Sequence, residues 1–115
     1  ANLAMVTASD PVAGVVVLKD YIIHTHAKDG VHRGDCDRAR VYHGFATGNP
    51  DKIDYNALFA EVPLGDGDVD WPNYLAALRA IGYDGFLTIE REVGDDPARD
   101  IGCAVEFLQR QLAAI

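Results

Sequence analysis

Only two segments of the chain have the composition of β-strands, and each is followed by a helix-forming stretch. Residues 21–27 are rich in β-branched and aromatic side chains and end at the turn signal Asp29-Gly30, and residues 86–90 form a second, shorter strand candidate. Strands that alternate with helices predict parallel βα units and an α/β fold. Two parallel strands cannot cover both faces of a sheet, so we expect further strands from outside this chain.

Three helix starts share one local pattern, an Asp beside a Pro. They fall at residues 10–11, 70–72 and 95–97, where the Asp can cap the helix and the Pro occupies its first turn. The third helix is expected to bury one face, which carries Ile101, Val105, Leu108 and Leu112. Residues 31–68 predict a long loop, functional or mobile, with a weakly helical or extended piece around 55–61.

Chemically active side chains alternate at the end of the first strand. Ile22, His24, His26 and Lys28 are spaced two apart. Side chains at this spacing point to one face of a strand, so the two imidazoles and the ammonium converge. The pattern predicts a functional site at this strand end.

Composition restricts the partners of such a site. The 115 residues fit one domain, and acidic residues outnumber basic ones 18 to 10, for a net charge of −8. We therefore expect neither nucleic acid nor an anionic membrane as a partner, because both bind through clustered Lys and Arg. Cys36 and Cys103 are far apart and predict neither a zinc knuckle nor a disulfide scaffold, which favours a reducing cytoplasm.

Three motifs together resemble one known family. They are HTHAKDG at residues 24–30, EVPLGDGDVDW at 61–71 and IGYDGFLTIERE at 81–92, and they resemble the xylose isomerase-like sugar isomerase/epimerase family. The family fold is an eight-stranded (β/α) barrel of about 250 residues. The resemblance implies that residues 1–115 are a single partial domain, the C-terminal portion with strands seven and eight and their flanking helices. Residues 1–3 resemble the stretch that follows the sixth strand.

The resemblance also implies a divalent metal site, commonly for Mn, Mg, Co or Zn. In the family two acidic residues from mid-barrel strands, a histidine on strand seven and a glutamate on strand eight hold the ion, and His26 and Glu90 match the last two. Glu90 would also act as the acid/base that moves a proton next to a carbonyl. Glu92 is its rival on the same face, but Arg91 and Glu92 are expected to cap the strand or pair at the surface. The first two ligands lie upstream, so this chain alone should bind metal poorly.

Other candidate residues keep two interpretations. His24 either contacts substrate or fills the barrel, and Lys28 either holds a substrate hydroxyl or carboxylate or is simply solvated. Arg33 falls in the loop where epimerase relatives place a substrate-contacting arginine. The run 65–68 predicts a tight turn rather than a calcium loop, because it lacks the DxDxDG spacing.

The resemblance favours a metal-dependent isomerase or epimerase that acts on a small sugar or a sugar-like polyol or keto compound. Dehydratases and endonucleases of abasic DNA use the same barrel, although the acidic charge weighs against the nuclease. A third hypothesis is a noncatalytic fragment whose apolar residues, such as Ile22, Phe86 and Thr88, are covered by a second copy or by a missing N-terminal barrel segment.

Overall fold

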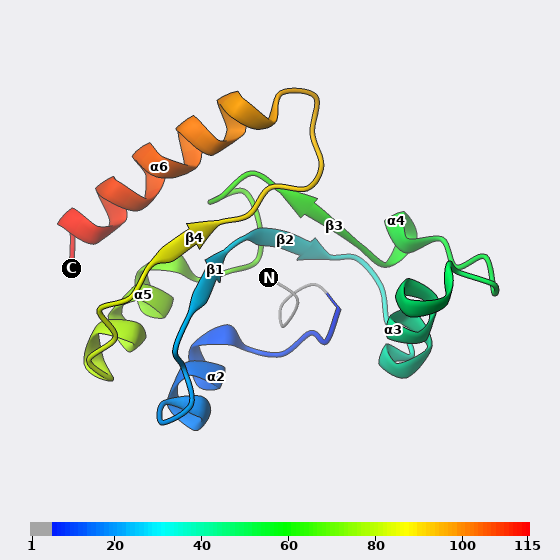
Figure 1. The fold of residues 1–115 in the computed structure, drawn as a ribbon, viewed down its shortest axis with the longest axis horizontal. Coiled ribbons are helices and arrows are strands. Elements are labelled where there is room, and N and C mark those ends of the chain that lie inside the picture. Colours follow the sequence, from blue (N-terminus) through cyan, green and yellow to red (C-terminus); the bar gives the residue numbers. More distant parts are fainter. Residues whose placement is uncertain (1–5) are drawn as a thin grey trace.

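A computed structural model describes residues 6–115, and the segment 1–3 compared above with the end of a sixth strand lies outside this range. The chain forms five helices and four strands in the described range (Figure 1). They are α2 (Pro11–Leu18), β1 (Thr25–Ala27), β2 (Asp29–His32), α3 (Arg38–Thr47), α4 (Tyr55–Leu58), β3 (Phe59–Val62), α5 (Trp71–Ala80), β4 (Leu87–Ile89) and α6 (Pro97–Ala113).

The strands form two separate pairs. β1 and β4 are parallel, with His26 opposite Thr88, and β2 and β3 are antiparallel, with Gly30 opposite Glu61. β2 follows β1 almost directly, so the second pair continues from the carboxyl end of the first (Figure 1). The predicted α/β class with parallel βα units is confirmed.

The three predicted helix starts are confirmed by their caps. The side chains of Asp10, Asp70 and Asp96 each accept a hydrogen bond from a backbone amide in the first turn of α2, α5 and α6, and each helix has a Pro in that turn. Gly82, just past α5, has the left-handed φ of 76° typical of a helix end. None of the helices in residues 6–115 combines the length and the apolar character needed to span a bilayer.

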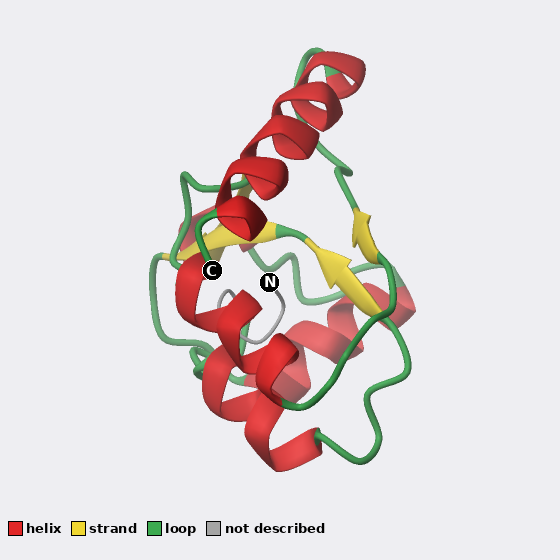
Figure 2. Ribbon diagram, turned by 90° about the vertical axis from the view of Figure 1, so that its left-hand side faces the viewer, coloured by secondary structure: helices red, strands yellow, loops and turns green. Residues whose placement is uncertain are grey.

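The main core is formed by side chains of the parallel strand pair, of helices α5 and α6 and of the segment before α5. Figure 2 shows helices above and below the strands. The core contains Ala27, Val69, Trp71, Leu75 and Leu108. Trp71, Leu75 and Leu78 lie on one face of α5 and are buried, as expected for an amphipathic helix that packs on a core.

The predicted buried face of α6 is wrong in part. Leu108 is buried, but Ile101, Val105 and Leu112 are 40%, 41% and 49% exposed. The helix is rotated because Phe107 packs edge-to-face on Trp71, with ring centroids 5.9 Å apart. Ala104 therefore becomes the second fully buried residue of α6.

The long loop predicted for residues 31–68 is also wrong in part, because this segment contains half of β2 and all of α3. The helical or extended piece predicted around residues 55–61 is confirmed, since α4 and β3 lie there. Asp37 caps α3 by accepting the Arg40 amide, and Gly48 ends that helix with a φ of 77°. A second apolar cluster of Val6 and Val41 holds the segment together. The helix and strand patterns in this segment are short and are surrounded by Gly, Asp and Asn, so the sequence as a whole resembled a loop.

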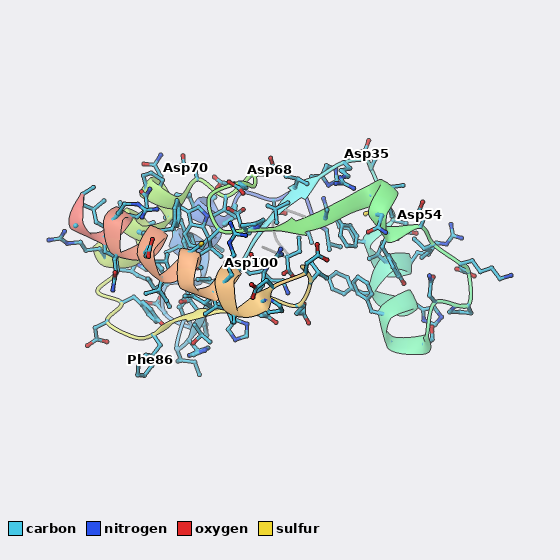
Figure 3. The ribbon with its side chains drawn as sticks, turned by 90° about the horizontal axis from the view of Figure 1, so that it is seen from above. Asp35, Asp54, Asp68, Asp70, Phe86 and Asp100 are labelled. Carbon is cyan, nitrogen blue, oxygen red and sulfur yellow. The ribbon has the colours of Figure 1, made fainter. Side chains whose placement is uncertain are left out.

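The first strand is shorter than predicted, since β1 covers only Thr25–Ala27. Its partner β4 is equally short, and residues before Thr25 have no strand beside them within the described chain. Tyr21 and Ile23 are consequently 80% and 91% exposed. Phe86, just before β4, is 79% exposed and projects from the side of the molecule opposite Asp68 and Asp70 (Figure 3).

The overall shape is flat, with principal extents of 44 × 34 × 21 Å. The accessible surface is 7160 Å², where a folded monomer of this mass exposes about 6,200 Å². The radius of gyration is 14.9 Å, against about 13 Å for a compact domain of this length. The chain thus exposes more surface than a self-contained domain of its size.

Candidate functional site

The carboxyl ends of β1 and β4 bring two predicted site residues together. His26 Nδ1 lies 2.9 Å from Glu90 Oε2, and the two side chains are 53% and 34% exposed. Parallel pairing fixes this contact, because the Glu90 amide donates to the Ala27 carbonyl and continues the ladder by one residue. An imidazole and a carboxylate, both open to solvent, therefore share the end of the sheet.

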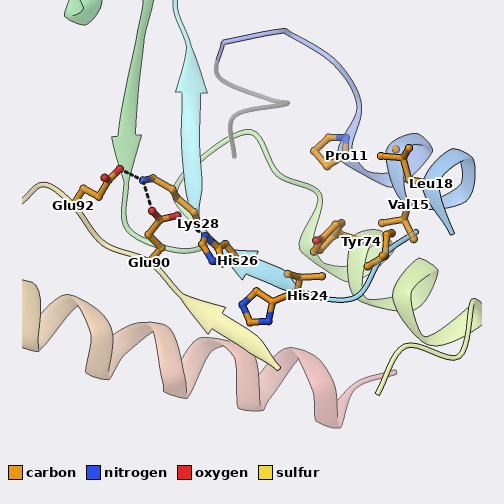
Figure 4. Close-up of a pocket in the computed structure, with 12 residues that line it drawn as sticks. Pro11, Val15, Leu18, His24, His26, Lys28, Tyr74, Glu90 and Glu92 are labelled. Atoms are coloured by element: carbon orange, nitrogen blue, oxygen red, sulfur yellow. Dashed lines mark hydrogen bonds and ion pairs between the residues drawn. The ribbon is translucent and has the colours of Figure 1, made fainter. Parts of the chain in front are cut away.

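Lys28 is buried beside this pair, which rules out its interpretation as a solvated surface residue. Its side chain is 8% exposed, and Nζ lies 3.0 Å from Glu61 and 3.7 Å from Glu90 and also contacts Glu92 (Figure 4). Burial alone would lower the pKa of Lys28, but hydrogen bonds to Glu92 and Glu61 outweigh it and raise the pKa above its ordinary value. The lysine stays charged and holds three carboxylates together.

Glu61, on β3, is a member of this cluster that the sequence analysis did not single out. One oxygen faces Lys28, while the other accepts from Arg91 at 2.8 Å and from the backbone amides of Glu92 and Val93 at 2.9 and 3.4 Å. Burial would raise the pKa of Glu61, but its bonds with Lys28, the Glu92 amide and Arg91 lower it below its ordinary value. Its place at the start of the second family motif is the only sequence signal for it.

Arg91 corrects a prediction, because its side chain is buried rather than paired at the surface. It is 9% exposed and bonds to Glu61 and, at 2.7 Å, to Asp100 in the first turn of α6. Burial would lower its pKa, but the bonds to Asp100 and Glu61 outweigh burial and raise it. The surface expectation fits only Glu92, whose side chain is 66% exposed. Arg91 thus ties the strand end to the last helix.

The cavity in front of His26 and Glu90 has a volume of about 490 Å³, within the usual range for small-ligand pockets. The other lining residues come from α2, from α5, from the segment before β1 and from the ends of β1 and β4 (Figure 4). They include Val15, Leu18, His24, Lys28, Tyr74 and Glu92. His24 Nε2 lies 3.1 Å from Thr88 Oγ1, and its ring stands edge-on to that of His26 at 5.4 Å. Four of the predicted residues therefore meet at one cavity.

Arg33 is the predicted substrate-binding residue that the structure does not bring to this cavity. It lies in the connection from β2 to α3, and its Nη1 donates to the Asn56 carbonyl at 2.8 Å. Its backbone amide donates to the Leu58 carbonyl. These bonds fasten the connection to α4.

Asp29, another residue that the sequence analysis did not assign to any site, organises the loop beside the cluster. Its side chain is fully buried and accepts five N–H bonds. The donors are the amides of Gly30, Gly65, Gly67 and Val69 and the indole of Trp71, the last at 2.7 Å. The tight turn expected at residues 65–68 is present, and this carboxylate positions it. A Cβ on Gly67 would lie 2.2 Å from Asp29 Oδ1, so glycine is required there.

The donors at this site match part of a divalent-metal site. A neutral imidazole and a carboxylate suit Mn²⁺, Co²⁺ or Zn²⁺, and a cation would have to displace any proton that His26 and Glu90 share. Within residues 6–115, no three His, Cys, Asp or Glu side chains converge closely enough to hold an ion. These two residues can therefore supply only part of a coordination shell.

A comparison with protein families shows the family to which the chain belongs. The sequence profile described as "Xylose isomerase-like TIM barrel" matches residues 2–111. The chain belongs to the xylose isomerase-like TIM barrel family. This finding confirms the resemblance seen in the three motifs, and no match was found among curated proteins.

A solved structure supports the same assignment. The xylose isomerase domain protein from Planctomyces limnophilus superposes with a TM-score of 0.67 and 28% sequence identity. The alignment covers 96% of this chain but 33% of that protein. This member of the xylose isomerase-like family thus spans about one third of the length of the solved relative.

The buried cluster predicts a large effect for Glu61→Gln. We expect this change to lower the free energy of unfolding by about 2 kcal/mol or more, because it removes the charge that faces Lys28 and Arg91. Glu106→Gln breaks only an exposed pair with Arg110 on α6 and should cost less than about 0.5 kcal/mol. Urea denaturation of both variants measures these values.

The contribution of Glu61 to the free energy of unfolding depends on pH in one defined direction. Since the folded-state pKa of Glu61 is lowered from its ordinary value of 4.5, its contribution is complete above pH 4.5 and is lost as the pH falls through the folded-state value. The stability difference between the wild type and Glu61→Gln should therefore shrink in acid. A difference that stays constant down to pH 3 would contradict the assigned role.

Proposed function

We propose that β1 and β4 are the seventh and eighth strands of a xylose isomerase-like barrel, and that residues 1–115 are a partial domain. Three observations support this placement: the strands are parallel, helix α5 lies between them in the chain and helix α6 follows β4, and the polar cluster lies at their carboxyl ends. Active sites of such barrels lie at the carboxyl ends of the strands. The remaining strands would come from outside this chain.

In this barrel His26 and Glu90 hold a divalent cation, Mn, Mg, Co or Zn, together with ligands from other strands. The observation that carries the proposal is the 2.9 Å contact between His26 Nδ1 and Glu90 Oε2 at the end of two parallel strands. A bound cation supplies Lewis-acid polarisation of sugar oxygens. The expected function is that of a metal-dependent sugar isomerase or epimerase.

The residues of this chain divide the remaining roles. Glu90 is placed to accept a proton from the carbon next to the carbonyl of a sugar or keto substrate and to return it. Lys28 Nζ lies 3.7 Å from the second oxygen of Glu90, so an ammonium group faces the carboxylate that would act as this base. His24, in the same cavity, offers an imidazole to substrate hydroxyls.

Charge favours this function over that of nuclease relatives, whose partner is polyanionic DNA. The net charge is −8, and three carboxylates surround Lys28, so a phosphate backbone would be repelled. Residence in the cytoplasm belongs to the same proposal, since Cys36 and Cys103 are free thiols.

Paramagnetic line broadening by Mn²⁺ tests the metal ligands on this chain even if the half-site binds weakly. In amide-resolved NMR spectra, Mn²⁺ should broaden the resonances around His26 and Glu90 first. His26→Ala combined with Glu90→Gln should abolish this broadening, whereas His43→Ala, which removes an exposed histidine on α3, should not change it. Broadening that persists in the double variant would refute the assigned ligands.

A second candidate function is assembly through the uncovered sheet. Tyr21, Ile23 and Phe86 are 80%, 91% and 79% exposed around the start of the parallel pair, and each strand of that pair has one neighbour in the described chain. Open strand edges and exposed apolar groups favour association. Either a second copy or the absent barrel segment would cover them.

Sedimentation equilibrium tests association of this chain. We expect an average mass above that of the monomer that rises with concentration, because burying Ile23 and Phe86 is favourable. Ile23→Lys should shift the equilibrium toward monomer, and Tyr42→Lys, on α3, should not. A folded chain that remains monomeric at every concentration would exclude self-association.

A further inference from the structure

A second cavity lies on the other side of Lys28 from the proposed metal half-site. Its volume is about 530 Å³, large enough for a small organic ligand. Lys28 and Glu92 line both cavities, so one ion pair separates the two. The second cavity is formed mostly by α3, α4 and β3, which belong to the segment between β1 and α5.

Three aromatic rings form one wall of this cavity. Phe45 on α3 packs at 4.8 Å from Tyr55 and at 6.2 Å from Phe59, and the last two rings are 6.1 Å apart. Phe45 is nevertheless 50% exposed, although large apolar side chains are usually buried. The faces of such rings carry partial negative charge and attract C–H groups that carry partial positive charge.

Polar groups line the same cavity opposite the rings. Glu92, whose side chain is 66% exposed, can accept further hydrogen bonds beside Lys28, and Asn56 offers an amide that both donates and accepts. A purely apolar ligand would leave these groups without partners at a cost. A pyranose ring meets both requirements, because it presents C–H groups on its face and hydroxyls along its edge.

We propose that this cavity binds a second sugar ring, so that the substrate is a disaccharide or another glycosylated sugar rather than a free monosaccharide. The reacting unit lies at His26 and Glu90, and the attached ring lies on Phe45, Tyr55 and Phe59. The identity of the reacting unit rests on the proposed function, but recognition of the attached ring does not require the metal. Loops at the carboxyl ends of barrel strands commonly set specificity, which agrees with the position of α3 and α4.

Titration of the metal-free chain with sugars tests this site by amide-resolved NMR. Glucose, cellobiose and maltose are the probes, and at least one disaccharide should shift the resonances of Phe45, Phe59 and neighbouring residues with a Kd at least ten-fold below that of glucose. Phe45→Leu keeps an apolar side chain but removes the ring face, and it should weaken that binding about ten-fold. Tyr42→Leu changes an exposed ring on α3 that does not line the cavity, and it should leave the Kd unchanged.

Two results would overturn the inference. One is that neither disaccharide binds more tightly than glucose, and the other is that Phe45→Leu and Tyr42→Leu give the same Kd. Circular dichroism of both variants shows whether folding is preserved, and Tyr55→Leu provides a second probe of the same wall if Phe45→Leu unfolds. Because no metal is present, the result is independent of whether Mn²⁺ binds at His26 and Glu90.

Discussion

The parallel pairing of β1 with β4 is the contact on which the rest of the structure depends. It joins residues 62 positions apart, and its register places Glu90 beside His26 at the carboxyl end of both strands. The same pairing holds Ala27 over the core formed with α5 and α6. Each strand is only three residues long, so few backbone hydrogen bonds join the two strands. Side-chain contacts must therefore stabilise the pair as well.

Buried charges provide much of that support. Lys28 connects the end of β1 to β3 and to the segment after β4, and Glu61 and Arg91 extend the connection to α6. Each of these buried charges has an opposite partner, which is the condition under which burial is tolerated. The network that stabilises the strand pair therefore also positions Glu90 and separates the two cavities.

Sequence reasoning succeeded where the signals were local. Asp-Pro helix starts and the alternation of His24, His26 and Lys28 depend on neighbouring residues, and the three motifs identified the family. It missed Asp29 and Glu61, because most of their partners lie thirty or more positions away and their burial depends on the whole fold. The rotation of α6 was missed for the same reason, since the packing of Phe107 on Trp71 decides it.

We propose that β1 and β4 form a sheet to which polypeptide outside residues 1–115 adds further strands. Hydrogen–deuterium exchange of the amides at 25–27 and 87–89 tests it most directly, at low and at high protein concentration. We expect both strands to be protected together, and their protection to increase with concentration while that of α3 stays constant. Strand amides that exchange as in an unfolded chain would contradict the strand pair, and the same protection at every concentration would contradict its completion by a second copy.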